Sequence, residues 1–356
     1  MIMIQKMKIH IVSETSFFMK STGVHTAFVN HIKLLKEKDD VEVVVNDEGM
    51  GDIFHGHTFG FYYLWMGRKY KGRRVFTVHV IPDSIKGSLP VWWLFMPFIK
   101  LGLKIVYSYT DVCIAISPMV EKAIIETGAK TKIVNIYNPI DIETWKRTTE
   151  KRAKGRKMLG LTDTDFVVLG VGQLEGRKGV DDFLDVAEAI PEVKFVWAGG
   201  RPFGGLTEGI KRIDERFKSA GENVIHPGEI VLEEMPFIYA AADMMLFPSY
   251  QENCPLAPIE AAACGMPVIY RDIEEYRSLY ENPYLKASDT EDFIELTKRM
   301  INDREFFNEG LKISNQLLKQ FEKDLIRRKL IDTYESLLNS SIDLSKGFSS
   351  FSWETI

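Results

Sequence analysis

Short apolar runs alternate with amphipathic helical patterns along most of the sequence, and this alternation constrains the fold more than any other feature. The runs are only a few residues long and rich in Val and Ile, which is typical of strands covered by helices on both faces. The expected strands are Lys8–Val12, Val41–Val45, Val75–Val78, Val112–Ala115 and Ile133–Ile136, then Phe166–Val171, Lys194–Ala198, Asn223–His226, Met244–Phe247 and Pro267–Ile269. Helical patterns such as Thr26–Lys36, Pro118–Glu126 and Val180–Ala189 lie between them. The alternation predicts an α/β fold with parallel sheets and right-handed crossovers.

The length of the chain and a polar interruption predict two domains. A domain takes roughly 100–200 residues, and the chain has 356. The basic stretch Asp141–Asp165 separates the two series of strands; we interpret it as a solvated surface that includes the first helix of the second domain. We expect a doubly wound domain over 1–145, a second over 146–310, a C-terminal helix over 311–338 and a tail over 339–356. Such domains would face each other across a central cleft, with ligands beyond the carboxyl ends of the strands.

Charge and cysteine content exclude several classes of protein. The formal net charge is −5, which argues against nucleic acid as the main partner. Cys113, Cys254 and Cys264 have neither a disulfide framework nor zinc-ligand spacing, so we expect a reduced, cytoplasmic protein. The segment Met1–Val12 lacks the apolar core and cleavage site of a signal peptide.

The segment Ser249–Cys264 carries two carboxylates around the start of an alanine-rich helix. Glu252 sits in the turn after a strand, and Glu260 follows in the second turn if the helix begins near Pro255. A helix N-terminus offers free N–H groups and partial positive charge to a phosphate. The two acids could then bind hydroxyl groups at the two ends of a sugar nucleotide. The alternative is that both are ordinary helix and surface acids.

A second segment, Val171–Gly179, directly follows the strand Phe166–Val171. Its glycines let a ligand approach the backbone closely. Arg177 and Lys178 place positive charge at the carboxyl end of a strand, where phosphates bind in this class of fold. Glycine-rich turns of this kind are common, so the segment alone does not identify a ligand.

These two segments, in this order, resemble the retaining GT-B glycosyltransferases of glycosyltransferase family 4. That family has two glutamates separated by seven residues, as Glu252 and Glu260 are here. It also has a Gly-Arg-Leu run followed by Lys-Gly, and here the run is Gly172-Gln173-Leu174 followed by Lys178-Gly179. The resemblance covers about Lys8 to Leu338. It implies the GT-B fold, in which two Rossmann-like domains flank the active site.

Other positions match the family as well. Gly23 corresponds to the N-terminal glycine loop that faces the donor phosphate, and His79 to the histidine at the end of a strand of the first domain. Asn138–Asp141 resembles the family's sequence at the domain crossover, and Gly228 falls where the backbone contacts the nucleobase.

Two departures from the family pattern affect the expected phosphate site. The family's phosphate-binding arginine is Gln173 here, and an uncharged amide binds phosphate more weakly than a guanidinium. We expect Arg177 or the acceptor to supply the missing charge. Pro255 removes one backbone donor, so we expect the N–H groups of Leu256 and Ala257 to bind the phosphate instead.

The resemblance implies transfer of a hexosyl group with retention of anomeric configuration and without a protein nucleophile. Charge that develops on the leaving diphosphate would be stabilised by Lys178, by Arg177 and by the helix N-terminus. Glu252 would bind hydroxyls of the donor sugar, and Glu260 the ribose. A neutral His79 would orient the reacting centre, although a structural histidine in the core is the alternative.

No metal is expected. His55 and His57 have the spacing of a metal pair but lack an evident third ligand, and we interpret them as structural. Asp163 and Asp165 resemble a metal-binding Asp-x-Asp, but they precede a strand of the second domain and are interpreted as a turn or helix cap. The resemblance likewise implies a reaction that needs no metal or other cofactor beyond the nucleotide-sugar.

The acceptor is suggested by the segment Gly87–Tyr109, which is rich in aromatic residues and carries Lys100 and Lys104. Such a helix can lie in a membrane interface and present a lipid acceptor; a helix buried in the first domain is the alternative. The amino-acid sequence of Ser249–Tyr276 resembles that of bacterial enzymes that add a second hexose to a glycosylated diacylglycerol. We therefore expect a UDP-hexose donor and a glycolipid acceptor at a membrane surface. A soluble acceptor, or a GT-B isomerase or sensor, are the other hypotheses.

Overall fold

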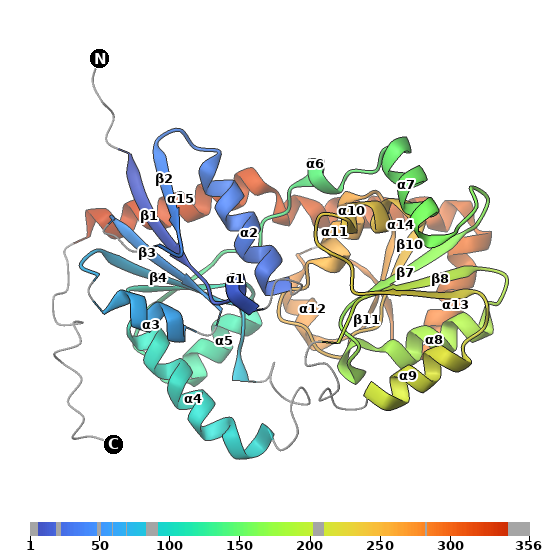
Figure 1. Cartoon of the computed structure of the whole chain (residues 1–356), viewed down its shortest axis with the longest axis horizontal. Helices are drawn as coiled ribbons and strands as arrows, with labels where there is room; N and C mark the ends of the chain where they lie inside the picture. Colours follow the sequence, from blue (N-terminus) through green and yellow to red (C-terminus); the bar gives the residue numbers. More distant parts are fainter. Residues whose placement is uncertain are drawn as a thin grey trace. The chain divides into compact units, whose positions relative to one another are not determined.

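A computed structural model of the chain describes residues 6–18, 23–47, 51–58, 60–68, 70–82, 92–201, 210–281 and 283–340. It divides the chain into two compact units (Figure 1). The first contains the N-terminal part up to Pro82, Phe95–Pro139 and the chain from Lys323 onward, and the second contains mainly Ile140–Glu322. Residues 87–91 of the aromatic segment Gly87–Tyr109 and the expected tail beyond residue 340 lie outside the described residues.

The first unit is built on a parallel sheet of six strands. The strands are β1 (Met7–Val12), β2 (Val41–Val45), β3 (Ile53–His57), β4 (Arg73–Val78), β5 (Val112–Ala115) and β6 (Lys132–Asn135). Their order in the sheet is β2-β1-β3-β4-β5-β6, and each neighbouring pair is parallel. Strand β2 lies on one side of β1, and β3 and the later strands lie on the other, so the strand order reverses next to β1. The carboxyl ends of β1 and β3 are therefore the topological switch point of this sheet.

Helices complete the first unit. They are α1 (Thr15–Phe18), α2 (Gly23–Lys36), α3 (Phe61–Gly67), α4 (Trp92–Ser108), α5 (Pro118–Glu126) and α15 (Lys323–Asn339). The start of α5 is coded locally, because Ser117 accepts a hydrogen bond from the N–H of Val120 and Pro118 occupies the first turn.

Strand β3 was not among the expected strands. Its sequence, Ile-Phe-His-Gly-His, places two polar residues in a short run, but both His55 and His57 are fully buried. His55 is hydrogen-bonded through Nδ1 to the hydroxyl of Tyr334 at 2.7 Å and through Nε2 to Thr77 at 2.7 Å. These partners satisfy the polar atoms of His55, so a strand with polar residues can cross the core.

The second unit repeats the architecture. Its strands are β7 (Val167–Val171), β8 (Lys194–Ala198), β9 (Val224–Gly228), β10 (Met244–Phe247), β11 (Val268–Arg271) and β12 (Leu285–Ala287), in the order β12-β11-β10-β7-β8-β9. All neighbouring pairs are parallel. Here the switch point lies between β7 and β10. The two sheets confirm the expected α/β fold of two doubly wound units.

The helices of the second unit are α6 (Ile142–Trp145), α7 (Thr149–Leu159), α8 (Val180–Ala189), α9 (Ile210–Ser219), α10 (Met235–Ala241), α11 (Ala257–Ala263), α12 (Glu274–Leu279), α13 (Thr290–Asn302) and α14 (Arg304–Leu318). Phe183 of α8 packs edge-on against Phe195 and Trp197 of β8 in the core of this unit. These large buried rings supply much of the apolar area that stabilises the fold.

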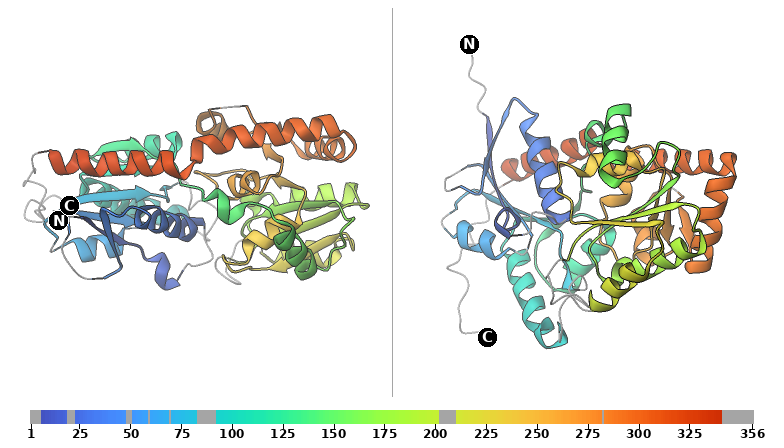
Figure 2. Two further views of the ribbon diagram at one scale, coloured as in Figure 1. Left: turned by 90° about the horizontal axis from the view of Figure 1, so that it is seen from above. Right: turned by 45° about the vertical axis from the view of Figure 1, so that its right-hand side comes forward.

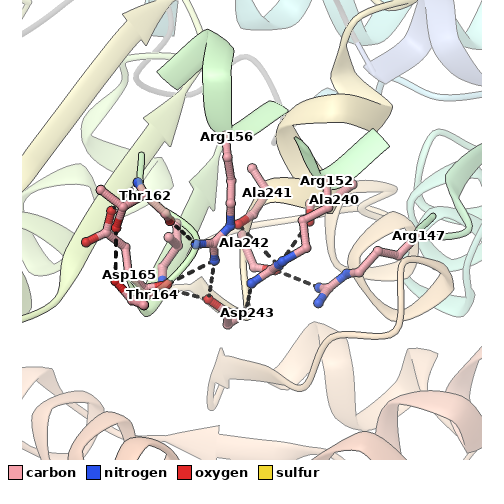
Figure 3. Close-up of polar contacts among 11 residues, drawn as sticks. Arg147, Arg152, Arg156, Thr162, Thr164, Asp165, Ala240, Ala241, Ala242 and Asp243 are labelled. Carbon is pink, nitrogen blue, oxygen red and sulfur yellow. Dashed lines mark hydrogen bonds and ion pairs between the residues drawn. The ribbon is translucent and has the colours of Figure 1, made fainter. Parts of the chain in front are cut away.

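The basic stretch before β7 is only partly a solvated surface: Lys146, Lys154 and Lys157 are exposed, whereas the arginines contact the rest of the unit. Arg147 and Arg152 donate hydrogen bonds to carbonyl groups at the end of α10, and Arg152 also binds Asp243 at 2.7 Å (Figure 3). Arg156, only 2% exposed, binds Asp243 and the carbonyl of Asp165. The last carbonyls of a helix carry partial negative charge and lack intrahelical donors, so the guanidinium groups stabilise them. This cluster attaches α7 to the sheet.

The C-terminal helical pattern is interrupted. A C-terminal helix was expected over 311–338, but α14 ends at Leu318, a 3-10 turn spans Lys319–Phe321, and α15 begins at Lys323. The break falls where the chain passes from the second unit to the first. Figure 2 shows α15 running along the elements of the first unit, where Lys323 and Arg327 pair with Glu37 of α2.

Candidate donor site in the second unit

Two loops meet at the switch point of the second sheet. One follows β7 and contains the turn Gly176–Lys178, and the other follows β10 and leads into α11. Because β7 and β10 are hydrogen-bonded neighbours, both loops leave the same edge of the sheet side by side. These are the two segments in which the sequence predicted donor-binding residues.

Lys178 and Glu252 form an ion pair between the two loops. The ammonium of Lys178 donates a hydrogen bond to Oε1 of Glu252. The side chains are 15% and 9% exposed respectively, so the pair is largely removed from water. The hydroxyl of Ser249 lies 2.7 Å from the same carboxylate oxygen. Both contacts use Oε1, and none of the described residues donates to Oε2, which leaves that oxygen for a further partner.

The Lys-Gly pair is needed to bring Lys178 to this position. Gly179 adopts a φ of +71°, in the left-handed region that favours glycine. A Cβ atom at residue 179 would lie 2.3 Å from the carbonyl oxygen of Pro248, at the end of β10. Only a residue without a side chain lets the two loops approach this closely. Gly172 matters less, since a Cβ there would be 3.4 Å from the aliphatic chain of Lys178.

Further contacts fasten the two loops to each other. The carbonyl of Arg177 accepts hydrogen bonds from the N–H of Tyr250 at 2.8 Å and from Ser249 at 3.1 Å. Arg271 donates to the carbonyl of Pro248 at 2.8 Å and pairs with Asp182 at 2.8 Å. Buried polar contacts thus fasten both loops of the site to the rest of the unit, which limits the movement of its charged groups.

Burial and charge act in opposite directions on the pair. Burial lowers the pKa of Lys178 below its ordinary value, although Glu252 opposes the shift. Burial alone would raise the pKa of Glu252, but the charges of Lys178 and Arg177 bring its pKa below the ordinary value. Glu252 is therefore a carboxylate at neutral pH, able to accept hydrogen bonds from sugar hydroxyls.

Arg177 was expected to replace the charge of the family's phosphate-binding arginine, which is Gln173 in this chain. Nε of Arg177 lies 2.6 Å from a carboxylate oxygen of Glu175. Part of its charge is thus neutralised within its own loop. Gln173 is half-buried in the same loop, and its carbonyl accepts the N–H of Glu175 at 2.8 Å. Compensation of Gln173 by Arg177 remains a prediction.

Glu260 lies in the first turn of α11, not the second, because the helix begins at Ala257 rather than near Pro255. Its side chain is 6% exposed. The hydroxyl of Tyr239 donates to Oε2 of Glu260 at 2.6 Å. Burial raises the pKa of Glu260 to about 7, and the bond from Tyr239 only partly opposes this. A carboxyl group that titrates near neutrality is unusual and is often found at functional sites.

The remaining donor-site candidates of this unit also lie near the ends of strands or helices. Leu256 is the N-cap of α11, and Ala257 is its first residue, so their N–H groups stand at the helix N-terminus. Gly228 ends β9 with a φ of +82° and has open space where a Cβ would stand.

Gly23 and His79 belong to the first unit. Gly23 is the exposed first residue of α2, and His79 directly follows β4 and is 5% exposed. Nε2 of His79 lies 3.0 Å from Nδ1 of His57. Burial, with a contribution from His31, lowers the pKa of His79 to about 3, so the imidazole is neutral at physiological pH. The buried contact with His57 equally fits the alternative of a structural histidine, so the orienting role of His79 stays a prediction.

The structure also bears on the two metal-like patterns. Among the described residues, no group of three or more His, Cys, Asp or Glu side chains could hold a metal ion. Asp165 accepts a hydrogen bond from the N–H of Thr162 at 2.6 Å and so closes the turn before β7. That is the role as a turn residue that the sequence suggested for this Asp-x-Asp.

Sequence reasoning did not identify three residues that shape the site: Ser249, Tyr239 and Asp182. Tyr239 and Asp182 contact a predicted residue or its loop through partners distant in sequence, whereas Ser249 contacts both the distant Arg177 and the nearby Glu252. Ser249 alone had a local signal, because it opens the segment that carries both glutamates.

Comparison with known families and proteins agrees with this geometry. The sequence profile described as "Glycosyl transferases group 1" matches residues 151–315, and the profile "Glycosyltransferase Family 4" matches residues 26–144. The alpha-galactosylglucosyldiacylglycerol synthase of Streptococcus pneumoniae is 30% identical over 337 residues, which cover 93% of this chain and 90% of that protein. The chain belongs to the group 1 glycosyltransferases. It is therefore an enzyme of the glycosyl-transfer class.

Other relatives of this glycosyltransferase fit the same picture. The processive diacylglycerol alpha-glucosyltransferase of Acholeplasma laidlawii is 28% identical over 317 residues, covering 86% of this chain and 92% of that protein. The D-inositol 3-phosphate glycosyltransferase of a Mycobacterium species is 33% identical, but only over 140 residues, or 38% of this chain and 31% of that protein.

Solved structures show that the glycosyltransferase has the GT-B fold. Anabaena HepE, crystallised with UDP and glucose, has a TM-score of 0.74 at 19% identity and is matched over 93% of this chain and 100% of that chain. Sucrose-phosphate synthase from Thermosynechococcus elongatus gives a TM-score of 0.75 at 16% identity, over 94% and 100%. At these identities the likeness concerns the fold.

Proposed function

We propose that this glycosyltransferase transfers a hexosyl group, with retention of configuration, from a UDP-hexose to a glycolipid of the diacylglycerol class. The observation that carries the donor part is the Lys178–Glu252 pair at the β7/β10 switch point, beside the N-terminus of α11. It places a cation, helix N–H groups and a carboxylate around the position where open α/β sheets bind nucleotides.

In this proposal, different residues of the second unit bind different parts of the donor. Lys178 and the N–H groups of Leu256 and Ala257 stabilise the negative charge that develops on the leaving diphosphate. The free oxygen of Glu252 binds hydroxyls of the donor sugar, and Glu260 binds the ribose. The neutral imidazole of His79, from the first unit, orients the reacting centre. These residues form no covalent intermediate, and the reaction needs no metal.

Helix α4 supports the lipid acceptor. Its exposed apolar side chains include Phe95 (55% exposed), Phe98 (73%) and Leu101 (46%). The helix carries the exposed Lys100 and Lys104 and contains no acidic residue. An apolar face flanked by lysines suits the interface of an anionic bilayer. Within the described part of the chain, no helix has both the length and the apolarity for a membrane span.

The names of the two longest-matching relatives point to the same acceptor class, because both are diacylglycerol glycosyltransferases by name. The nucleotide fits the solved HepE complex with UDP and glucose. We therefore place the enzyme at the surface of a membrane, on the side where nucleotide-sugars are available.

The donor is tested by incubating the purified protein with UDP-glucose and UDP-galactose, with and without vesicles that contain glucosylated diacylglycerol. We expect slow nucleotide release alone and a lipid-linked disaccharide when vesicles are present. Absence of nucleotide release from either donor, under both conditions, would refute the proposal. Epimerised donor without transfer would instead indicate an isomerase.

The acceptor surface is tested by flotation with anionic vesicles. The Phe95→Ser/Phe98→Ser variant should float much less than the wild type, whereas Ile125→Ser should float normally. Ile125 is 60% exposed on α5, so this control removes an exposed apolar side chain elsewhere in the same unit. A wild-type protein that never floats would favour a soluble acceptor.

A further inference from the structure

The hydroxyl of Tyr239 and the carboxylate of Glu260 form a contact that the proposed reaction does not by itself explain. They lie 2.6 Å apart, on α10 and α11 respectively. Tyr239 is fully buried and Glu260 is 6% exposed. The phenol ring is held in turn by Trp145, whose ring meets it edge-on with centroids 5.0 Å apart. Tyr239 thus has one fixed orientation, with its hydroxyl aimed at Oε2 of Glu260.

We propose that Tyr239 is the positioning residue for nucleotide recognition: it holds Oε2 of Glu260 so that Oε1 is presented to the ribose hydroxyls of the donor. This inference rests on the proposed function, in which Glu260 binds the ribose.

The chemistry of the two groups supports this division. An ionised carboxylate only accepts hydrogen bonds, and a phenol donates one. Among the described residues, Tyr239 is the one hydrogen-bond donor to the side chain of Glu260. A buried carboxylate with a single donor is under-satisfied, and leaving it so is costly. The hydroxyl groups of a ribose supply the missing donors.

The other titratable groups around Glu260 do not replace Tyr239. Cys264, one turn further along α11, is buried with its pKa raised by that burial. On the neighbouring elements, α6 carries the exposed Glu143, α14 carries the exposed Glu305, Glu309 and Lys312, β11 carries Arg271, which is bound to Pro248 and Asp182, and β10 carries no ionisable residue. Burial raises the pKa of Glu260, and the hydrogen bond from Tyr239 lowers it.

The decisive experiment compares UDP with 2′,3′-dideoxy-UDP, by calorimetric titration, in the wild type and in Tyr239→Phe. In the wild type we expect the dideoxy nucleotide to bind more weakly than UDP. In Tyr239→Phe, the affinity for UDP should fall about 5- to 20-fold, and the difference between the two nucleotides should shrink. With donor sugar, the KM should rise by a similar factor while kcat changes less than twofold.

A second comparison uses Glu260→Gln. If Tyr239 acts through Glu260, Tyr239→Phe should change UDP affinity little in the Glu260→Gln background. The matched control is Tyr63→Phe in the first unit, which removes another fully buried tyrosine hydroxyl, one that has no hydrogen-bond partner within the described part of the chain. Its UDP affinity should equal that of the wild type.

The outcomes separate this inference from the function on which it rests. A wild type that binds UDP, combined with a Tyr239→Phe variant that keeps the full ribose discrimination, would overturn the role of Tyr239 alone. A wild type that binds no UDP would overturn the proposed function as well. If Tyr239→Phe does not fold, the Tyr239→Phe/Glu260→Gln variant, which buries no carboxylate without its donor, takes its place: it should bind UDP as tightly as Glu260→Gln does. A double variant that binds UDP much more weakly than Glu260→Gln would refute the inference.

Discussion

Replacing Gly179 by alanine tests whether the approach of the two loops creates the donor site. Two effects add at this position. Residue 179 has a φ of +71°, and an alanine in the left-handed region costs about 1–2 kcal/mol. The new Cβ atom would also lie 2.3 Å from the carbonyl oxygen of Pro248, so the two loops must separate. Overpacking of this kind costs about 1–3 kcal/mol. We expect Gly179→Ala to lower the free energy of unfolding by about 2–5 kcal/mol.

Gly160→Ala is the matched control, because Gly160 has a similar φ of +67° but no atom within 4 Å of the position of a Cβ. It isolates the backbone effect and should cost about 1–2 kcal/mol. Urea unfolding of both variants, followed by far-UV circular dichroism, measures the difference. Gly179→Ala should also bind UDP at least tenfold more weakly, because the loop that carries Lys178 moves away from Glu252. Equal destabilisation by the two substitutions, with UDP affinity unchanged, would refute the reasoning.

Three further predictions concern buried charges. Lys178→Met leaves the carboxylate of Glu252 buried without its cation, so it should lower the free energy of unfolding, measured in urea, by about 3–5 kcal/mol. The Lys178→Met/Glu252→Gln variant should recover most of that stability, and a double variant as unstable as the single one would contradict this. Because the pKa of Glu260 is raised to about 7, the folded state binds more protons than the unfolded state between pH 4.5 and 7. Its contribution to stability therefore falls as pH rises through that range, so Glu260→Gln should be the more stable protein at pH 8, by up to roughly 3 kcal/mol, and not at pH 4; parallel stability curves would count against it. Arg156→Met should destabilise the protein by about 3 kcal/mol or more, because Asp243 loses a buried partner; a change in thermal midpoint of less than a degree would show that the cluster is dispensable.

The parts of the fold that follow from local patterns could be predicted from the sequence. The helix Val180–Ala189 was located to the residue, since its apolar spacing and its flanking glycine are local signals. The location of Lys178 and Glu252 in one site was also predicted, from the family resemblance, and β7 and β10 do lie side by side; the ion pair between the two side chains was not predicted.

Features that depend on distant partners could not be predicted. Strand β3 carries His55, which is polar in sequence but satisfied in the core by Tyr334 and Thr77. The basic stretch looked solvated because the carbonyl groups of α10 that it binds come much later in the chain. The contact between Tyr239 and Glu260 has the same character: no spacing rule connects them, and only the packing of α10 against α11 does.

The most direct test of the donor site compares uridine, UDP and a UDP-hexose by calorimetric titration in the wild type and in Lys178→Met/Glu252→Gln, in which no buried charge is left unpaired. The wild type should bind UDP far more tightly than uridine, and the double variant should lose most of that difference, because Lys178 no longer meets the diphosphate. A double variant that distinguishes UDP from uridine as well as the wild type does would show that the diphosphate binds elsewhere, and the proposed donor site would be wrong.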